Sequence, residues 1–345
     1  MKTMNIHLAV LMLISLLAVS CENEIKFNGE ETSPLLVVNS FFTPDSLVKV
    51  HVSKSKFFLK DDSSFDVVNN AVVNLWINDV KIEKLKSIGE GYYLGTYMPS
   101  VNNRIRITAE NTDFSQVSGT TEIIRPVNIL SVDTTSRMLE STPITIVSSK
   151  PTGGLKIDTI GKINTKQLNF KVNFMDLPNV KNFYRLMVTV RQYFADGTNK
   201  DAPFYFYSED LVFGKNSERG IFNEGSNNDY FVFTDELFES KKYGLKFYSN
   251  FYEYIYFNEV VNRIDNPKFD FNTPIKSELH INIQSISKSY FMFAKSRVAN
   301  LTVNEFFSEP VQIYSNVIGG IGIIGSYTNS LYSIDIPLTV EQKYY

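Results

Sequence analysis

Short runs of β-branched and aromatic residues, interrupted by Asn, Asp, Gly and Pro, recur along most of this 345-residue chain. In residues 47–53, which read LVKVHVS, apolar side chains occupy alternate positions, as a half-buried strand requires. Good helix formers are poorly represented, whereas Val, Ile, Thr, Tyr and Phe are frequent. The sequence therefore predicts a mainly β fold, built from short strands joined by tight turns.

The amino terminus has the composition of a bacterial export signal. Lys2 precedes an almost unbroken apolar run, residues 8–19, of about a dozen residues, whereas a membrane span needs about 20. Residues 17–21 read LAVSC and resemble a lipobox, although Ala18 stands where Leu is commonest. Cys21 is the only cysteine and cannot form an internal disulfide, so lipidation is the role that the sequence predicts for it. An ordinary secretory signal is the alternative.

The residues after Cys21 bear on location. Glu22, Asn23 and Glu24 resemble the acidic signal that directs Bacteroidetes lipoproteins to the cell surface, and a solvated acidic linker is the alternative. Cleavage before Cys21 would leave 325 residues and change the formal net charge from −3 to −4 through loss of Lys2. Because the chain has no basic stripe or run that would neutralise phosphates, nucleic acid is not an expected partner.

A mature chain of this length exceeds what one hydrophobic core usually serves, so two domains are expected. We assign 1–20 to a lipoprotein signal peptide, 21–32 to an acylated tether, 33–124 to a first domain and 125–345 to a larger antiparallel β domain. About seven strand-like runs in the first domain favour an immunoglobulin-like or transthyretin-like sandwich. The clearest of these runs are 35–39, 47–53, 71–76, 81–85, 91–96 and 104–109.

The second domain is predicted to contain strands at 167–174 and 183–194 and a single packed helix near 287–301. In that helix apolar residues recur at spacings of three and four, and Ser287 or Ser289 can cap its start. Residues 133–162 are rich in Ser, Thr, Gly and Pro and are interpreted as a long loop or a weak hairpin. Residues 316–325 contain four glycines, which favours tightly turned backbone over a regular strand.

Several loose motifs occur in an order that is specific when they are taken together. They are 36–39 (LVVN), 70–73 (NAVV), 91–93 (GYY), 174–178 (FMDLP), 182–185 (NFYR), 233–238 (FTDELF), 286–290 (ISKSY) and 309–323 (EPVQIYSNVIGGIGI). On these motifs the chain resembles the Bacteroidetes outer-membrane lipoprotein family called domain of unknown function 4249 (DUF4249). It departs from the family at Leu177, where Asp is frequent, and at Ile324, where Phe is frequent. The resemblance implies a surface-exposed lipoprotein encoded near TonB-dependent receptors, and implies no established activity.

Catalytic and metal sites have little support in the sequence. After cleavage only His51 and His280 remain, both in strand-like patterns, which is too few for a zinc site, and no nucleophile motif of the type Gly-x-Ser-x-Gly occurs. Paired carboxylates can hydrolyse glycosidic bonds, and the candidate pairs are Asp235 with Glu236 and Glu253 with Glu259. A calcium site at Asp61, Asp62 and Asp66 is less favoured than a solvated hairpin tip. We expect no cofactor.

The segment 204–257 contains 18 Phe and Tyr residues in 54 positions, more rings than one core face needs. Tyr205, Tyr207, Tyr252 and Tyr254 are therefore candidate contacts for a ligand or partner, because exposed Tyr side chains are favoured at binding surfaces. The alternative is a core shared between the sheet and the helix.

Together these features predict a non-enzymatic, surface-exposed outer-membrane lipoprotein, attached to the membrane through lipid on Cys21. It would serve as an accessory or ligand-binding subunit of a TonB-dependent receptor system for nutrient capture. The alternatives are a surface hydrolase of glycan or peptide that uses paired carboxylates, and a structural or adhesive surface protein.

Overall fold

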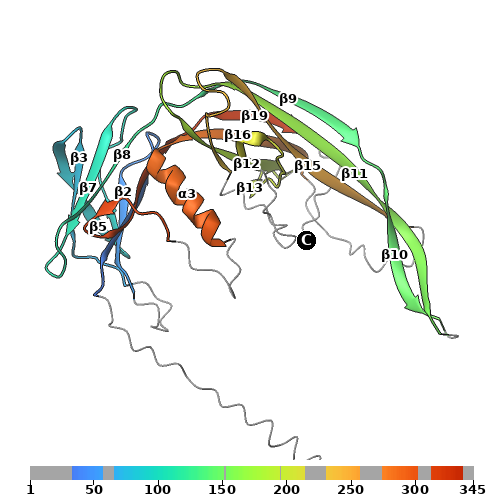
Figure 1. Cartoon of the computed structure of the whole chain (residues 1–345), viewed down its shortest axis with the longest axis horizontal. Helices are drawn as coiled ribbons and strands as arrows, with labels where there is room; N and C mark the ends of the chain where they lie inside the picture. Colours follow the sequence, from blue (N-terminus) through green and yellow to red (C-terminus); the bar gives the residue numbers. More distant parts are fainter. Residues whose placement is uncertain are drawn as a thin grey trace, which may run out of the picture. The chain divides into compact units, whose positions relative to one another are not determined.

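The computed structural model describes residues 33–56, 66–150, 153–194, 196–213, 231–256, 274–301 and 312–336. The signal peptide, Cys21, residues 22–24, Asp61 and Asp62 lie outside this part of the chain. The described residues fold mainly into β-strands with one α-helix (Figure 1), so the predicted fold class is confirmed.

The amino-terminal part is a two-sheet sandwich around an aliphatic core. Its strands are β1 (Leu36–Phe42), β2 (Lys49–Lys54), β3 (Val72–Ile77), β4 (Val80–Lys84), β5 (Lys86–Gly89), β6 (Tyr92–Leu94), β7 (Arg104–Glu110) and β8 (Val117–Glu122). Strands β1, β2, β6 and β5 are neighbours in one sheet, and β8, β7, β3 and β4 in the other. Alternate side chains of each sheet, such as Val50 and Leu75, enter the core between them. We call this the first core.

Two strands from the far end of the chain complete this sandwich. Strand β17 (Val317–Ile318) pairs with β8, and β18 (Ile321–Thr328) pairs in parallel with β1. The sequence-based expectation of turned backbone without a regular strand at 316–325 is therefore wrong for β18. Glycine is needed at position 322 because the backbones of β18 and β1 approach closely there. A Cβ on Gly322 would lie 2.1 Å from the Val38 carbonyl oxygen, and the φ angle of Gly322 is +125°.

The remaining described strands pack around a second core; β9, β10, β11 and β15 form a separate sheet, and the others continue the sheet of β1 and β2 through β18. Its elements are β9 (Asn128–Met138), β10 (Thr142–Ser149), β11 (Leu155–Met175), β12 (Phe183–Tyr193), β13 (Asn199–Pro203), the 3-10 turn η1 (Leu211–Phe213), β14 (Val232–Thr234), β15 (Lys242–Tyr256), β16 (Lys276–Ile286) and β19 (Leu331–Ile336). Strand β11 pairs with β9, β10 and β15, and β12 pairs with β13, β14 and β16. Rings such as Phe170 and Phe247 from the β11–β15 sheet pack with Leu186 and Ile281 from β12 and β16.

Residues 133–162, interpreted as a loop or a weak hairpin, form strands along most of their length. Strand β10 pairs with the first nine residues of β11, from Thr142 opposite Ile163 to Ser149 opposite Leu155. The hairpin interpretation is therefore correct and the loop interpretation is wrong, because backbone pairing compensates for the low content of large apolar residues. The boundary between domains at residues 124 and 125 stays a prediction, although the two cores contain mainly residues from its two sides.

The predicted helix is α3 (Lys288–Leu301), which begins directly after β16. Ser287 caps it, since its Oγ accepts a hydrogen bond from the Tyr290 backbone N–H at 3.3 Å. Phe291 packs on Phe183 of β12 with ring centroids 4.9 Å apart, and Tyr290 packs on Phe41 of β1 at 4.5 Å. The helix therefore contacts strands from both parts of the chain, whereas the sequence placed it within the second domain.

Candidate functional site

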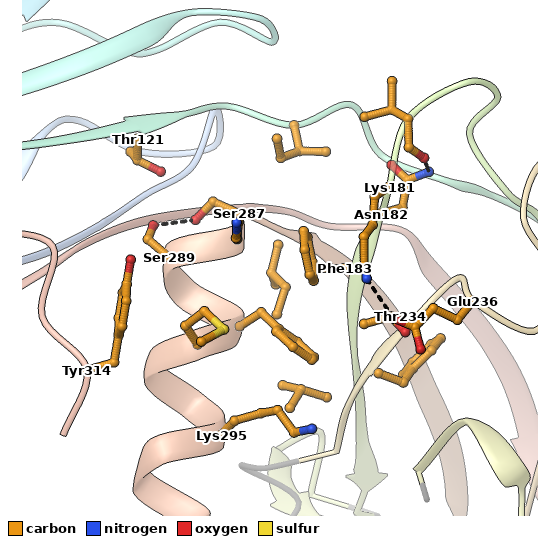
Figure 2. A pocket seen from close by; sticks show the side chains of 18 of the residues that line it. Thr121, Lys181, Asn182, Phe183, Thr234, Glu236, Ser287, Ser289, Lys295 and Tyr314 are labelled. Atoms are coloured by element: carbon orange, nitrogen blue, oxygen red, sulfur yellow. Dashed lines mark hydrogen bonds and ion pairs between the residues drawn. The ribbon is translucent and has the colours of Figure 1, made fainter. Parts of the chain in front are cut away.

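A groove of about 1090 Å³ lies between α3 and the turns that border β12 and β14 (Figure 2). Its wall is assembled from segments far apart in sequence. These are the end of β8, residues 180–183, η1, residues 232–234 with Glu236 and Leu237, the first two turns of α3, and Tyr314 with Asn316. We refer to it as the α3 groove.

Large apolar side chains border the α3 groove and are open to solvent. The exposed fractions are 61% for Val180, 72% for Leu211, 58% for Leu237 and 39% for Met292. Single exposed apolar residues are ordinary on a protein surface, but several around one hollow indicate a binding surface. The arrangement can accommodate an apolar group of a ligand and remove it from water.

Charged side chains occupy the same rim. Lys181 Nζ lies 2.6 Å from Glu236 Oε1, and this hydrogen bond raises the pKa of Lys181 and lowers the pKa of Glu236. Because both side chains are more than half exposed, water and salt screen the pair strongly. Lys295, one turn along α3 from Phe291, places its Nζ 5.5 Å from the centroid of that ring. Figure 2 shows Lys295 on the same wall of the groove as Ser287 and Ser289.

The end of the groove near the start of α3 is polar, and its groups are held by hydrogen bonds. Ser287 Oγ and Ser289 Oγ are 3.1 Å apart, and Ser289 Oγ donates to the Ile324 carbonyl at 2.9 Å. Asn316 Nδ2 donates to the carbonyls of Thr120 at 3.0 Å and Ile324 at 2.9 Å. These bonds connect α3, β8 and β18, so the polar end is a fixed part of the fold.

Two buried carboxylates support the wall without lining the groove. Asp176 accepts hydrogen bonds from the Tyr184 hydroxyl at 2.5 Å and the Ser240 backbone N–H at 2.6 Å. Asp235 Oδ2 accepts from the Asn182 backbone N–H at 2.7 Å. Burial raises the pKa of Asp235, and Asp176 raises it further, while the bond from Asn182 opposes both. Asp235 is 2% exposed and its geometry is that of a structural acceptor.

The candidate aromatic residues lie on β15, which contains Tyr252 and Tyr254, and on the segment beside it that contains Tyr205 and Tyr207. Tyr205 and Tyr207 are 40% and 39% exposed, and the Tyr207 ring stacks on Tyr248 at 5.6 Å. Tyr252 is half-buried, and the side chain of Tyr254 lies outside the described residues. Of the described tyrosines in this set, Tyr205, Tyr207 and Tyr252 do not line the α3 groove. Their role as ligand or partner contacts stays a prediction.

The Phe residues of the same segment are explained by packing. Phe204 and Phe206 are 1% and 0% exposed and lie in the second core, so Phe points inward and Tyr outward along 204–207. A core takes up many of these rings and packs on β11 and β12, but its described members include no residue of α3, whereas the alternative had the helix share that core. The alternation of Phe with Tyr is the sequence signal that separates the two faces.

The groove residues were missed as a site by sequence reasoning, because they come from distant segments. Signals for part of the wall were present, since Ser287, Ser289 and Asn316 belong to the motifs that carried the family resemblance. Leu177 and Pro178, which belong to another of these motifs, begin the turn that leads to Asn182 in the groove wall. Residues that look like unrelated loose motifs in the sequence meet at one groove in the structure.

Metal binding and membrane spanning find no support within the described residues. No group of three or more His, Cys, Asp or Glu side chains there is arranged to hold a metal ion. No helix of that part is both long and apolar enough to cross a membrane.

Comparisons with known proteins give one clear match. No curated protein matches the chain. A solved structure of a putative membrane anchored protein from Corynebacterium diphtheriae aligns at 8% identity over 75% of this chain, with a TM-score of 0.20. The aligned part covers only 56% of that structure's chain. The family model described as Domain of unknown function (DUF4249) matches residues 22–333, nearly the whole sequence. The chain therefore belongs to the DUF4249 family.

Proposed function

We propose that this protein is a surface-exposed outer-membrane lipoprotein that binds a ligand, without catalysis, as an accessory subunit of a TonB-dependent receptor for nutrient capture. The α3 groove carries the ligand-binding part of the proposal, because it combines exposed apolar side chains with a fixed polar end. The lipobox at Cys21 and the acidic residues after it support the location. The receptor partner rests on analogy with the family.

The groove's chemistry favours a ligand with an apolar body and an anionic or polar end. Val180, Leu211 and Leu237 offer apolar surface, and Lys295 offers a positive charge beside it. Apolar contact supplies most of the affinity in sites of this kind, while a few polar groups fix the orientation of the ligand.

Binding in the groove can be tested with a naphthalene dye that carries one sulfonate, titrated into the purified chain. Leu237→Asp should weaken dye binding by roughly tenfold, because a carboxylate replaces an apolar contact and repels the sulfonate. Ile318→Asp is the matched control, since Ile318 is 77% exposed and lies outside the groove. Equal losses in the two variants, or no loss in Leu237→Asp, would refute binding in the groove.

Anchoring is tested by Cys21→Ala in the expressed full-length chain. We expect the wild-type protein to incorporate labelled palmitate and to sediment with outer membranes, and the variant to do neither. Retention of the variant in the membrane fraction with unchanged labelling would exclude lipidation at this residue.

The receptor partnership is tested by affinity purification of the tagged protein from detergent-solubilised outer membranes. A TonB-dependent receptor should copurify in stoichiometric amount. Recovery of the protein without any such receptor would count against this part of the proposal. It would not affect ligand binding in the groove or lipid anchoring, which have separate tests.

A further inference from the structure

The sheet of β9, β11 and β15 has one face on the second core and the other on solvent. Phe170 of β11 and Phe247 of β15 point into the second core, so the residues beside them, Asn169 and Tyr248, point outward. These two are directly opposed across the strands, and Figure 1 shows β9, β11 and β15 side by side. We call the outward surface here the tyrosine face, and it consists of Gln167, Asn169, Tyr205, Tyr207, Tyr248 and Asn250.

Tyrosine rings form the part of this face at and beyond β15. Tyr207 and Tyr248 are a directly opposed pair, since each backbone N–H donates to the carbonyl of the other, at 2.7 and 2.8 Å. Their rings are stacked with centroids 5.6 Å apart. Tyr205 points to the same side, because the alternate residues Phe204 and Phe206 are buried in the second core. Exposed fractions of 40% for Tyr205 and 39% for Tyr207 leave apolar ring surface and hydroxyl groups within reach of a ligand.

Amide groups with fixed orientations lie next to these rings. Arg137 Nε donates to Gln167 Oε1 at 2.8 Å, and Gln167 Nε2 donates to Asn250 Oδ1 at 3.1 Å. Gln167 is only 5% exposed although it points outward, so its neighbours on the face hold it in place. The Asn250 side chain is thereby oriented with Oδ1 toward Gln167 and Nδ2 away from it. Groups that are already ordered bind a ligand without the entropic cost of fixing them.

The polar surface continues past β11. On β9, Arg137 lies opposite Gln167 and Thr135 lies opposite Asn169. No side chain of the tyrosine face is aliphatic, and neither are these two, whereas the buried centre of a stable protein interface is mostly apolar. The surface therefore suits a ligand that offers small apolar patches and many hydrogen-bonding groups together.

A sugar ring combines these two properties. The C–H groups on the faces of a pyranose pack against aromatic rings, and the hydroxyl groups around its rim both donate and accept hydrogen bonds. The tyrosine rings complement the first kind of surface, and the amide and hydroxyl groups complement the second. A protein segment with aliphatic anchors would find no apolar pocket among these side chains.

Charge and size narrow the kind of sugar. Arg137 is the only charged side chain among those named, and it is exposed, so salt screens it strongly. The other hydrogen-bonding groups are neutral, which favours a neutral sugar. Adjacent strands are about 4.8 Å apart, so the four neighbouring backbone segments from β9 to Tyr207 span roughly 15 Å, which is longer than one sugar ring. An open surface of this length suits a stretch of a chain.

We propose that the tyrosine face binds a neutral oligosaccharide chain, with pyranose rings packed on Tyr205 and Tyr207 and hydroxyl groups bonded to Asn250. This inference adds a second binding surface to the protein. It does not depend on the proposed function, because no residue of the tyrosine face lines the α3 groove.

The test is native electrophoresis of the purified full chain through gels that contain a neutral polysaccharide. The probes are hydroxyethyl cellulose, xyloglucan, glucomannan, amylopectin, dextran and laminarin, and at least one should retard the wild type. Tyr207→Ala should lower the association constant for that polysaccharide by roughly tenfold, because an exposed ring in contact with the sugar is removed. Tyr92→Ala is the matched control and should bind like the wild type. Tyr92 is a half-buried tyrosine of β6 with a ring contact of its own, to His51 at 4.8 Å.

A second measurement uses oligosaccharides cut from the retarding polysaccharide, titrated calorimetrically into the same chain. Affinity should rise with chain length, because a longer chain covers more of the open face. Asn250→Ala should weaken binding of the longest oligosaccharide, since it removes a fixed amide from the face. All variants should keep the wild-type melting temperature.

Several results would overturn the inference. Retardation of the wild type by none of the six polysaccharides would do so, as would equal losses in Tyr207→Ala and Tyr92→Ala. Loss of sugar binding in Leu237→Asp but not in Tyr207→Ala would assign the sugar to the α3 groove instead. Copurification of a protein that depends on Tyr207, with no polysaccharide bound, would make the face a protein interface. None of these results changes dye binding in the groove, so the proposed function would stand.

Discussion

The two cores of this protein use different side chains for the same task. Among the buried members of the first core only Phe42 and Tyr93 are aromatic, whereas rings make up half of the second. Alternating Val and Ile fill the space between the sheets of the first sandwich. In the second core rings meet in clusters, and Phe174 alone contacts Tyr184, Phe233, Phe238 and Tyr243. An aromatic core therefore depends more on a few large residues than an aliphatic core does.

Polar groups lie within the second core and in a layer between the two cores. Tyr184 reaches a buried carboxylate within the second core, and burial together with that carboxylate raises the pKa of its hydroxyl. Between the cores lies a layer of hydroxyl groups, in which Thr121 Oγ1 donates to Ser326 Oγ at 3.2 Å and the Ser326 N–H donates to Ser287 Oγ at 3.0 Å. One ten-stranded sheet crosses this layer, because β18 pairs with both β1 and β16.

The largest effect is expected from Phe174→Ala. Phe174 is fully buried at the centre of its ring cluster, so the substitution should lower the free energy of unfolding by about 3–5 kcal/mol. Thermal unfolding followed by circular dichroism gives the measurement. The counterpart in the aliphatic core is Ile107→Val, expected to cost about 0.5–1.5 kcal/mol.

The same pair of variants shows whether the cores unfold together. If the shared sheet makes them one cooperative unit, both variants should shift a single transition. Two transitions, of which Phe174→Ala moves only one, would show that the hydroxyl layer separates independent units.

The pairing of β18 with the first sandwich is tested by Gly322→Ala. The added methyl group would clash with the Val38 carbonyl and the residue would keep a positive φ, so the cost should be about 2–4 kcal/mol. Gly153→Ala is the control, because Gly153 also has a positive φ but no atom within 4 Å of the added Cβ, and about 1 kcal/mol is expected. Equal costs for the two variants would mean that β18 relaxes without loss of its pairing to β1.

Local patterns predicted the elements that depend on local physics. The alternation in 47–53 matches β2, and the spacing with the Ser287 cap matches α3. Strand β18 was missed because its glycines indicate turns locally, while its pairing with β1 joins residues such as Asn39 and Ile323, which are 284 positions apart. No local pattern records a partner at that distance.

The candidate site was less predictable than the fold for the same reason. Tyr205 and Tyr207 were identified because neighbouring rings stand out in a sequence. The groove could not be identified in this way, since Val180, Leu237 and Met292 look like ordinary apolar residues until the turns and the helix bring them together. A groove of this kind forms only when distant segments pack together, and a single sequence does not show which segments will do so.

A smaller effect is expected from Asp176→Asn, which tests the polar support of the aromatic core. The carboxylate accepts the Tyr184 hydroxyl on one oxygen and the Ser240 backbone N–H on the other, so an amide would place N–H groups opposite one of these donors. The expected loss of stability is about 1–3 kcal/mol. Unchanged stability in urea unfolding would show that the aromatic rings of the second core alone stabilise the turn that follows β11.

The smallest effect is expected from Asp235→Asn, and it depends on pH. Because the pKa of Asp235 is raised in the folded state, the folded protein binds this proton more tightly than the unfolded chain does. The wild type should therefore lose stability as the pH rises from the ordinary Asp value through the raised one, whereas the variant, which cannot ionise, should not. The difference in urea midpoint between variant and wild type should thus increase in the variant's favour from about pH 4 to about pH 7. A constant difference would show that Asp235 does not titrate differently in the folded state. The same variant tests for catalysis, since a polymer-cleaving activity that disappears with Asp235→Asn at unchanged stability would favour a hydrolase over the binding function proposed for the groove.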